Sequence, residues 1–260
     1  MSPDNVAAFS MSVNSQPSVH IALLGGFDLV VNDVSVAVPV GSKRLLAFIS
    51  LNYPYRVSVP RALIAGSLWP EASEQKAHTN LRAALTRLHG LGRKALDISP
   101  SEVRLARETT VDLHHARSLA QRILDPCIPA EDLGLNAATV DQLSADLLPG
   151  WYDEWVLLEA EKWRQLRLHA LEELAGEFID AEQFAGAVTA AHTAVQADPL
   201  RESSQVSLIR AHLAEGNLAE ALDHFERYAW RLRNELGLRP TQRLRRLVAE
   251  LRQSPPGGGQ

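Results

Sequence analysis

The sequence has a single cysteine, Cys127, so no disulfide bond can form within its 260 residues. It also lacks any apolar run close to the ~20 residues that a membrane-spanning helix needs. The stretch 1–18 contains neither a basic segment nor a continuous apolar core, which argues against a secretory signal. We therefore expect a soluble protein of a reducing cytoplasm that does not bind a membrane.

The motifs of common enzyme and metal sites are missing as well. Glycine-rich phosphate loops and the lysine-bearing P-loop are absent, and Gly25-Gly26 is typical of a turn. Adjacent histidines such as His114-His115 point to different faces of a helix, and no cluster of metal ligands at suitable spacing supports a site there. We predict no metal, no cofactor and no enzymatic activity.

Charge is unevenly distributed along the chain, although the total is only −5. Residues 1–40 carry three acids and no bases, whereas residues 41–110 carry eleven bases against five acids. Residues 111–260 carry fifteen bases against twenty-three acids. Phosphate contacts depend on charges within about a Debye length, ~8–10 Å at ordinary salt. The central basic block therefore favours a nucleic-acid-binding module joined to an acidic one.

The N-terminal part has the element order of a winged helix. Alternating apolar runs separated by turn residues predict a small antiparallel sheet at 19–24, 27–31 and 34–38. Three helices are expected next, at 42–51, 60–69 and about 74–91, with Pro60 in a first-turn position. Two short strands around a turn follow, at 96–98 and 103–105. Sheet, three helices and a terminal hairpin predict an α+β winged helix-turn-helix.

The C-terminal part is expected to be helical throughout. Its segments 183–188 and 217–222 repeat each other at a spacing of 34 residues, the period of the tetratricopeptide (TPR) helical hairpin. Small residues at Ala187 and Ala221 would let antiparallel helices approach closely, and Pro199 would end a helix. This pattern predicts an all-α TPR-like helical-repeat domain that binds protein, with a helical bundle and a chance repeat as the alternative.

Four regions follow from these patterns. They are a disordered tail at 1–18, a winged-helix domain at 19–110, a TPR-like domain at 111–251 and a flexible tail at 252–260.

The third predicted helix has the pattern of a DNA recognition helix. Apolar residues at helical spacing define its buried side: Ala77, Leu81, Ala84, Leu85 and Leu88. The opposite face and its flank carry Thr79, Arg82, Ala83, Thr86, Arg87 and His89. Arginine can donate twice to guanine, threonine can contact phosphate or a thymine methyl, and a small alanine permits close approach.

Further DNA contacts are predicted around this helix. Candidate phosphate contacts at helix starts are Lys43, Arg44, Lys76 and His78. On the terminal hairpin, Ser101, Arg104 or Arg107 could reach a minor groove or the backbone. The alternative is that Arg82 and Arg87 only solvate an exposed helix, with Glu71 and Glu74 as ion-pair partners.

Several motifs follow one another in a distinctive order. In the first half these are Leu23-Leu24-Gly25-Gly26-Phe27, Leu68-Trp69-Pro70 and Asn80-Leu81-Arg82-Ala83-Ala84-Leu85-Thr86-Arg87-Leu88. In the second half they are Val111-Asp112-Leu113, Leu147-Leu148-Pro149-Gly150-Trp151-Tyr152-Asp153-Glu154-Trp155, Asp198-Pro199-Leu200-Arg201-Glu202-Ser203 and Glu235-Leu236-Gly237-Leu238-Arg239-Pro240-Thr241. Together they cover about residues 19–251. They resemble the OmpR-type DNA-binding domain and the bacterial transcriptional activation domain of the Streptomyces antibiotic regulatory protein family.

The resemblance implies an activator that binds direct repeats in double-stranded DNA near the promoter, as a homodimer, and recruits RNA polymerase including its sigma factor. It implies a bacterial cytoplasmic protein, found at the nucleoid when bound to DNA, that controls a biosynthetic gene cluster. Asn80, Arg82, Thr86 and Arg87 fall on the family's recognition helix. Two departures are His89, where many members have arginine, and Gly41-Ser42, where many have two basic residues.

The helical domain offers a candidate surface for the polymerase or another partner. We place it at Trp151, Trp155, Arg231 and Arg233, while Trp230 can face a partner or belong to the core. Two other functions stay open at this stage. The chain could be a TPR adaptor whose winged helix does not bind DNA, or a regulator gated by a small molecule near Trp151 and Trp155. The residues identify no effector.

Overall fold

The computed structural model describes residues 18–53, 57–129 and 136–253, with the side chains of 250–253 excepted, and it divides into two compact units. The first unit comprises Met1–Ala22 and Asp28–Val111, and the second comprises Leu23–Phe27 and Asp112–Gln260. The tails predicted at 1–18 and 252–260 lie largely outside the described residues. Among the helices that are described, none is long and apolar enough to cross a membrane.

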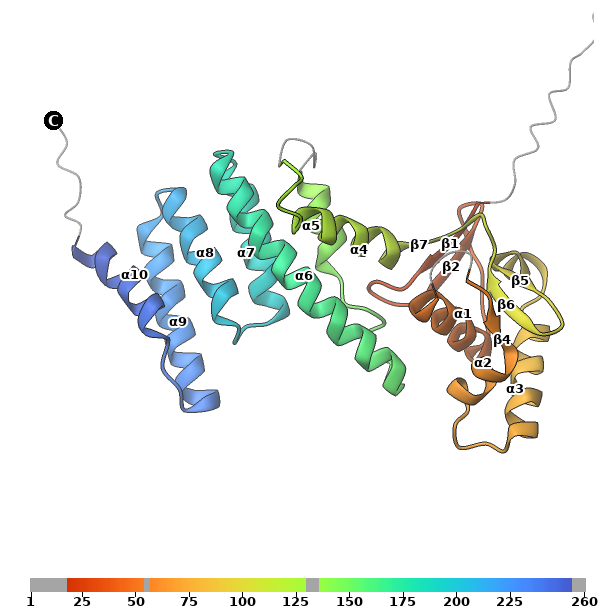
Figure 1. Cartoon of the computed structure of the whole chain (residues 1–260). Coiled ribbons are helices and arrows are strands. Elements are labelled where there is room, and N and C mark those ends of the chain that lie inside the picture. Colours follow the sequence, from red (N-terminus) through yellow and green to blue (C-terminus); the bar gives the residue numbers. More distant parts are fainter. Residues whose placement is uncertain (1–17, 54–56, 130–135, 254–260) are drawn as a thin grey trace, which may run out of the picture. The chain divides into compact units, whose positions relative to one another are not determined.

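The first unit contains a four-stranded sheet in the order β3-β2-β1-β7 (Figure 1). Its strands are β1 (Val19–Ala22), β2 (Asp28–Val31), β3 (Val34–Ser35) and β7 (Thr109–Val111). Asn32 and Asp33 both have positive φ, 51° and 63°, which matches a tight hairpin turn between β2 and β3. The prediction of a purely antiparallel sheet is wrong in one respect, because β7 pairs with β1 in parallel. The third strand is also shorter than predicted.

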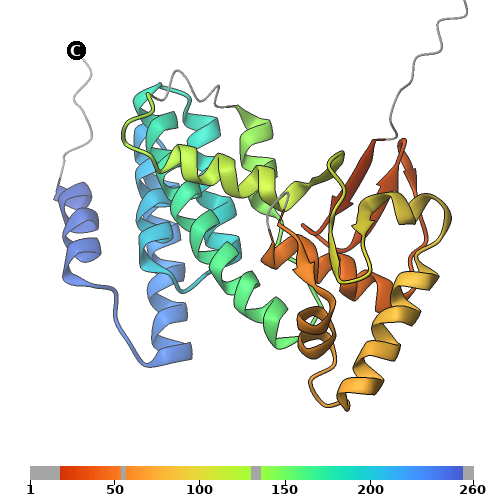
Figure 2. The ribbon, with the colours of Figure 1, turned by 45° about the vertical axis from the view of Figure 1, so that its right-hand side comes forward.

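Three helices pack beside this sheet: α1 (Val40–Asn52), α2 (Arg61–Leu68) and α3 (Glu74–Arg87) (Figure 2). All three predicted helices are present, with different ends. Pro60 is the residue before α2 and not its first turn. The helix α3 ends at Arg87, four residues earlier than predicted, and a 3₁₀ helix η1 (Gly90–Ala95) follows. Gly90 has a φ of +61°, which breaks the α-helical path.

The terminal hairpin of this unit consists of β5 (Leu96–Ile98) and β6 (Glu102–Leu105). A third strand that the sequence did not suggest, β4 (Val59–Pro60), pairs with β6 and gives the order β4-β6-β5. The amide of Arg61 also donates to the carbonyl oxygen of Ser101 at 2.9 Å. This hairpin is the wing of the predicted winged helix.

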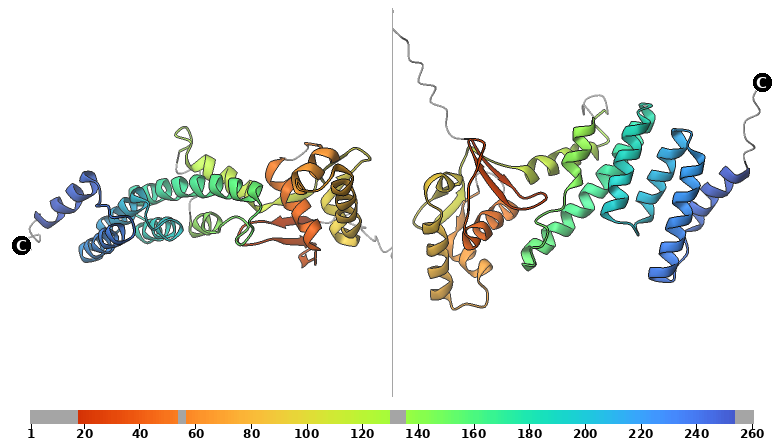
Figure 3. Two further views of the ribbon diagram at one scale, coloured as in Figure 1. Left: turned by 90° about the horizontal axis from the view of Figure 1, so that it is seen from below. Right: turned by 180° about the vertical axis from the view of Figure 1, so that it is seen from behind.

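Within its described residues, the second unit consists of helices and one β-bridge. These are α4 (Asp112–Ile123), α5 (Ala137–Ser144), α6 (Glu154–Asp180), α7 (Phe184–Ala197), α8 (Glu202–Ala214), α9 (Leu218–Leu236) and α10 (Gln242–Gln253). Successive helices α6 to α9 lie side by side and alternate in direction (Figure 3). The fold class predicted from the sequence, a winged helix-turn-helix followed by a TPR-like domain, is confirmed.

The 34-residue repeat reappears in the backbone. The residues that precede α7 and α9, Gln183 and Asn217, have nearly equal dihedral angles, φ/ψ of −93°/61° and −90°/66°. Each follows a residue with positive φ, Glu182 at 56° and Gly216 at 88°. Ala187 and Ala221 are fully buried, as predicted for close helix approach. The two hairpin turns are therefore copies of one structure.

Three of the sequence motifs meet in the second unit. The carboxylate of Asp112 accepts hydrogen bonds from the amides of Leu23 and Leu24 at 2.9–3.0 Å. Leu24 forms an antiparallel bridge with Leu147, and the amide of Leu148 donates to the carbonyl oxygen of Leu23 at 2.9 Å. The segment Leu23–Phe27 was predicted to belong to the winged helix, but its contacts assign it to the helical unit.

A fourth motif, 198–203, connects three parts of the helical unit. Asp198 pairs with Arg164 of α6 at 2.6 Å, and Arg201 pairs with Glu172 of α6 at 2.8 Å. Glu202 accepts a hydrogen bond from the amide of Thr241, just before α10, at 2.9 Å. These charges hold α6, α8 and α10 together.

Candidate nucleic-acid interface

The helix α3 has one buried and one exposed side, and local sequence determines where it starts. Ser73 caps it, its hydroxyl accepting a hydrogen bond from the amide of Lys76 at 3.4 Å. The predicted buried stripe is confirmed, since all five of its residues are at most 8% exposed: Ala77, Leu81, Ala84, Leu85 and Leu88. The opposite side of α3 therefore faces away from the core of its own unit.

Residues at the start of α1 fix the C-terminal half of α3. The buried hydroxyl of Ser42 donates to the carbonyl oxygen of Ala84 at 2.7 Å. A Cβ atom at Gly41 would lie 3.8 Å from the Cβ of Ala84, so α1 and α3 approach closely there. The two small residues that depart from the family pattern thus pack α1 against α3. In the sequence these two residues indicated only the loss of two positive charges.

The outward face of α3 is a stripe of small, hydroxyl and cationic side chains. Thr79, Arg82 and Thr86 are exposed, and Ala83 between them is half-buried. Their spacings of three, four and seven residues align them on one side of a helix. The hydroxyl of Thr79 donates to the carbonyl oxygen of Gln75 at 2.9 Å. A major groove is wide enough to admit a helix, and side chains of these types can contact the edges of its bases.

Three cations lie on the exposed side of α3. Lys76, Arg82 and Arg87 are exposed and have no ion pair within the part of the chain that the structure describes. Glu74, which the alternative interpretation assigned to these arginines, lies 3.9 Å from His78 instead. The helix therefore presents three positive charges that have no acid partner among the described residues, and such charges suit a phosphate-binding surface.

Four predicted residues occupy the margins of this face. His78 and Asn80 are half-buried and flank the exposed stripe on its two sides. Lys43 is half-buried as well, and Arg44 donates to the carbonyl oxygen of Leu68 at 3.0 Å, where α2 ends. Arg44 therefore supports the C-terminus of α2 in addition to any contact with DNA.

One residue that was assigned to the recognition helix lies outside it. His89 is exposed but comes after the end of α3, in extended backbone before η1. The prediction that α3 continues to residue 91 is therefore wrong for His89. Any contact of this histidine with DNA is made from the loop that leaves the helix.

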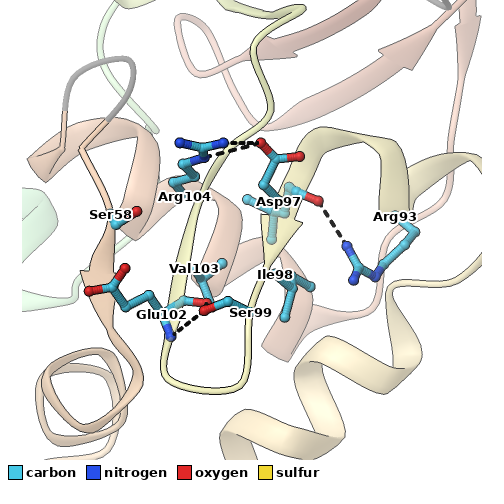
Figure 4. A pocket seen from close by; sticks show the side chains of 9 residues that line it. Ser58, Arg93, Asp97, Ile98, Ser99, Glu102, Val103 and Arg104 are labelled. Carbon is cyan, nitrogen blue, oxygen red and sulfur yellow. Dashed lines mark hydrogen bonds and ion pairs between the residues drawn. The ribbon is translucent and has the colours of Figure 1, made fainter.

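The wing carries Ser101 at its turn and Arg104 on β6, and both are exposed. Arg104 pairs with Asp97 across the hairpin at 3.1 Å, so part of its charge is already balanced. Figure 4 shows the two side chains facing each other at the edge of a shallow pocket of about 430 Å³. Arg93, on the other side, donates to the carbonyl oxygen of Leu96 at 2.8 Å (Figure 4). The wing is a weaker cationic surface than α3.

One residue near the wing was missed in the sequence. Arg61 begins α2, and its buried Nε atom has no hydrogen-bond partner among the described residues. Helix starts favour anions, so Arg61 joins the candidate phosphate contacts. The sequence could have indicated Arg61 through its position directly after Pro60, where a helix was expected to start.

Residues 136–252 match the family model of the bacterial transcriptional activator domain. These residues form a bacterial transcriptional activator domain. The match starts at α5 and confirms the resemblance to the Streptomyces antibiotic regulatory protein family. The chain is therefore a transcriptional activator that joins a winged helix to an activator domain.

A solved structure extends the likeness to both units. The chain is similar to Mycobacterium tuberculosis EmbR, whose structure was solved in complex with a low affinity phosphopeptide, with a TM-score of 0.67 and 18% identity. The match covers 94% of this chain and 67% of the EmbR chain. At this identity the match shows a common fold. Comparison with curated proteins gave no match.

The four residues predicted as a partner surface fall into two places in the helical unit. Trp151 is half-buried and stacks on Phe27, with ring centroids 6.2 Å apart and planes 26° apart. Trp155 is half-buried too, with its ring nitrogen inaccessible to solvent. Both tryptophans are thus partly covered by the protein, and the stacking of Trp151 on Phe27 gives it a packing role.

Arg231 and Arg233 lie on α9 of the activator domain and are exposed. Next to them Trp230 is 69% exposed, which settles the choice between core and surface for this residue. Trp230 and Arg231 border a groove of about 700 Å³ between α7, α8 and α9. An exposed tryptophan beside a groove is typical of a protein-binding site.

Two hydrogen bonds at the polar floor of this groove determine which atoms donate and which accept. Gln205 donates through Nε2 to the carbonyl oxygen of Pro199 at 2.6 Å, so its Oε1 accepts from Nε2 of His224, also at 2.6 Å. Burial, together with the charge of Arg227, lowers the pKa of His224 to about 4. His224 is therefore neutral at pH 7, and its Nδ1 is a hydrogen-bond acceptor.

Proposed function

We propose that this activator binds double-stranded DNA by inserting α3 into the major groove, with the wing and the start of α2 on the flanking backbone. It binds direct repeats as a homodimer and recruits RNA polymerase, including the sigma factor, through the helical unit. By resemblance to its family, its targets are promoters of a biosynthetic gene cluster.

The observation that best supports DNA binding is the set of unpaired cations on the exposed side of α3. Lys76, Arg82 and Arg87 are exposed, and no acid of the described ranges forms an ion pair with them. An ordinary solvated helix commonly pairs its charges at spacings of three or four residues, as α6 does with Glu161 and Arg164. On α3 the phosphates of bound DNA supply the opposite charge.

The types of residue on this face suit base recognition as well as phosphate binding. Arg82 lies between Thr79 and Thr86, in the middle of the exposed stripe. Its guanidinium can donate two parallel hydrogen bonds to O6 and N7 of guanine. Lys76 and Arg87 lie at the two ends of α3, where the phosphate backbones border the groove. We therefore assign base reading to Arg82 and positioning to the two terminal cations.

Contact with the polymerase is assigned to the groove beside Trp230. This groove has an apolar wall, an exposed aromatic ring and several charged side chains, which is the composition of a protein interface. Arg231 on its border pairs with Glu235 at 3.6 Å and remains 46% exposed. It is accessible to a partner while the groove keeps its shape.

The experiment is a binding selection on genomic fragments of the source organism with the purified chain, sequenced after selection at two salt concentrations. We expect enriched fragments to share a tandem repeat spaced by about one DNA turn. We also expect affinity to fall steeply with salt, with a slope of about −0.9 per phosphate neutralised. Binding without enrichment of any sequence would contradict the proposal.

A further inference from the structure

A second pocket of the helical unit lies between α8 and α10 and is lined by arginines. Its volume is about 350 Å³. Apolar side chains line part of it, among them Val206, Leu244 and Leu247. Arg210 of α8 and Arg243 and Arg246 of α10 complete the lining, and we call this site the arginine pocket.

The position of α10 is fixed, so the pocket has a defined shape. Glu202 accepts hydrogen bonds from the amide and the hydroxyl of Thr241, which precedes α10. The hydroxyl of Tyr228 also donates to Glu202, at 3.4 Å, and burial raises the pKa of Tyr228 to about 12, so this hydroxyl keeps its proton. Leu244 and Val248 of α10 are at most 3% exposed in a shared apolar cluster with α8 and α9.

The arginines of this pocket differ from most others in the helical unit. Six arginines elsewhere in this unit pair with acids, such as Arg117 with Glu159 at 2.7 Å and Arg227 with Asp223 at 3.0 Å. Arg210, Arg243 and Arg246 are exposed, and none has an ion pair among the side chains that the structure describes. No described acid lines the pocket. The site thus concentrates three positive charges around an apolar floor.

The surrounding sequence makes this concentration unusual. Residues 111–209 carry six bases against seventeen acids, whereas residues 210–260 carry nine bases against six acids. The basic end is therefore confined to the last part of an otherwise acidic domain. Like charges gathered on a fixed surface repel one another, and an opposite charge from outside relieves the repulsion.

We propose that the arginine pocket binds an acidic segment of a partner protein in which a large apolar side chain is flanked by carboxylates. The apolar side chain contacts Val206 and Leu247, and the carboxylates pair with the three arginines. DNA is a poorer occupant, because its phosphate backbone gains nothing from an apolar floor. The inference rests on the proposed function, since it names the chemistry by which a component of the transcription machinery is recognised.

The test uses the full chain and a short fluorescein-labelled peptide in which leucines are flanked by glutamates. Binding is measured by fluorescence anisotropy for wild type, for the double variant Arg243→Glu with Arg246→Glu, and for Arg210→Glu on the neighbouring helix. We expect the double variant to bind at least about tenfold more weakly, since reversal places like charges opposite each other. Arg245→Glu is the matched control, because Arg245 is an exposed arginine of α10 outside the pocket. It should bind within about twofold of wild type.

Further measurements distinguish an acidic peptide from other ligands of the pocket and check that each variant is folded. A peptide with glutamine in place of glutamate should lose most of its affinity, and thermal unfolding of each variant should match wild type. Equal binding by all variants, or by the glutamine peptide, would overturn the proposal. So would full competition by a DNA duplex, or self-association of wild type that Arg246→Glu abolishes in sedimentation, because the occupant would then be DNA or a second copy. The peptide assay contains no DNA, so failure of the wild type to bind promoters would refute the proposed function separately.

Discussion

Replacing Glu172 tests the charge network that joins α6 to α8. The side chain of Glu172 is 14% exposed and accepts four hydrogen bonds. Arg201 donates two of them, at 2.8 and 3.3 Å, and the hydroxyls of Ser203 and Ser204 donate the others at 2.8 and 2.6 Å. The substitution Glu172→Ala removes the acceptor of all four.

The expected loss follows from these partners. Removing one member of a buried ion pair costs about 3–5 kcal/mol, because the other charge loses its partner. Arg201 is 18% exposed and keeps a hydrogen bond to Gln165 at 3.1 Å, so part of this cost is avoided. We expect Glu172→Ala to lower the free energy of unfolding of the helical unit by about 2–3 kcal/mol. For a unit of this size the melting temperature then falls by about 5–10 °C.

The assay is thermal and urea unfolding followed by tryptophan fluorescence. Four of the five tryptophans lie in the helical unit, so the signal reports mainly on that unit. Glu173→Ala is the matched control, since Glu173 is exposed and its replacement should change stability by less than about 0.5 kcal/mol. A loss in Glu172→Ala as small as that of the control would refute the role of the network.

The same network predicts a pH dependence. Burial raises the pKa of Glu172, but hydrogen bonds from Arg201, Ser204 and Ser203 outweigh it, and the net pKa lies below its ordinary value of 4.5. The stabilisation is therefore fully present above pH 4.5 and is lost as the pH falls through the lowered pKa. The stability difference between wild type and Glu172→Ala should shrink below pH 4.5, and a constant difference would contradict this.

Three further outcomes are expected. Folding lowers the pKa of His224 from 6.5 to about 4, so the unfolded chain binds this proton at a higher pH than the folded chain. The free energy of unfolding should therefore fall as the pH is lowered from 6.5 towards 4, by about 3 kcal/mol at most. A nuclear magnetic resonance titration of the ring with a midpoint near 6 would disprove this. Lys76→Ala should reduce the salt slope of DNA binding by about one charge without changing sequence preference, and an unchanged slope would remove Lys76 from the phosphate contacts. Arg231→Glu should leave DNA binding intact and lower activated transcription in a reconstituted assay, whereas lost DNA binding would indicate a dimer contact instead.

Much of the winged helix could be predicted because its helices have strong apolar periodicity. The buried stripe of α3 was correct at every position, since burial on one side of a helix leaves a pattern with a period of 3.6 residues. The end of α3 was missed because Leu88 and Leu91 continue the pattern, while Gly90 adopts a positive φ. The strands β4 and β7 were missed because two or three residues are too few to show alternation.

In the helical unit too, structure set by local sequence was predictable, whereas contacts between distant segments were not. The 34-residue repeat predicted both hairpin turns, because the same local sequence positions produce the same backbone path. The stacking of Trp151 on Phe27 was not predictable, because it joins segments more than a hundred residues apart. The arginine pocket was missed for the same reason, as Arg210 and Arg246 meet only after α8 and α10 have packed.

The proposed function depends on α3 reading DNA in the major groove. Methylation protection of guanine N7 tests it most directly, because this atom lies in the major groove. On a selected operator, wild type should protect at least one guanine in each half-site, and Arg82→Ala should lose that protection while still protecting the neighbouring phosphates from cleavage. We expect its affinity to fall by about 1–3 kcal/mol on the operator and little on unrelated DNA. Unchanged guanine protection, or an equal loss of affinity on all sequences, would contradict base reading by Arg82.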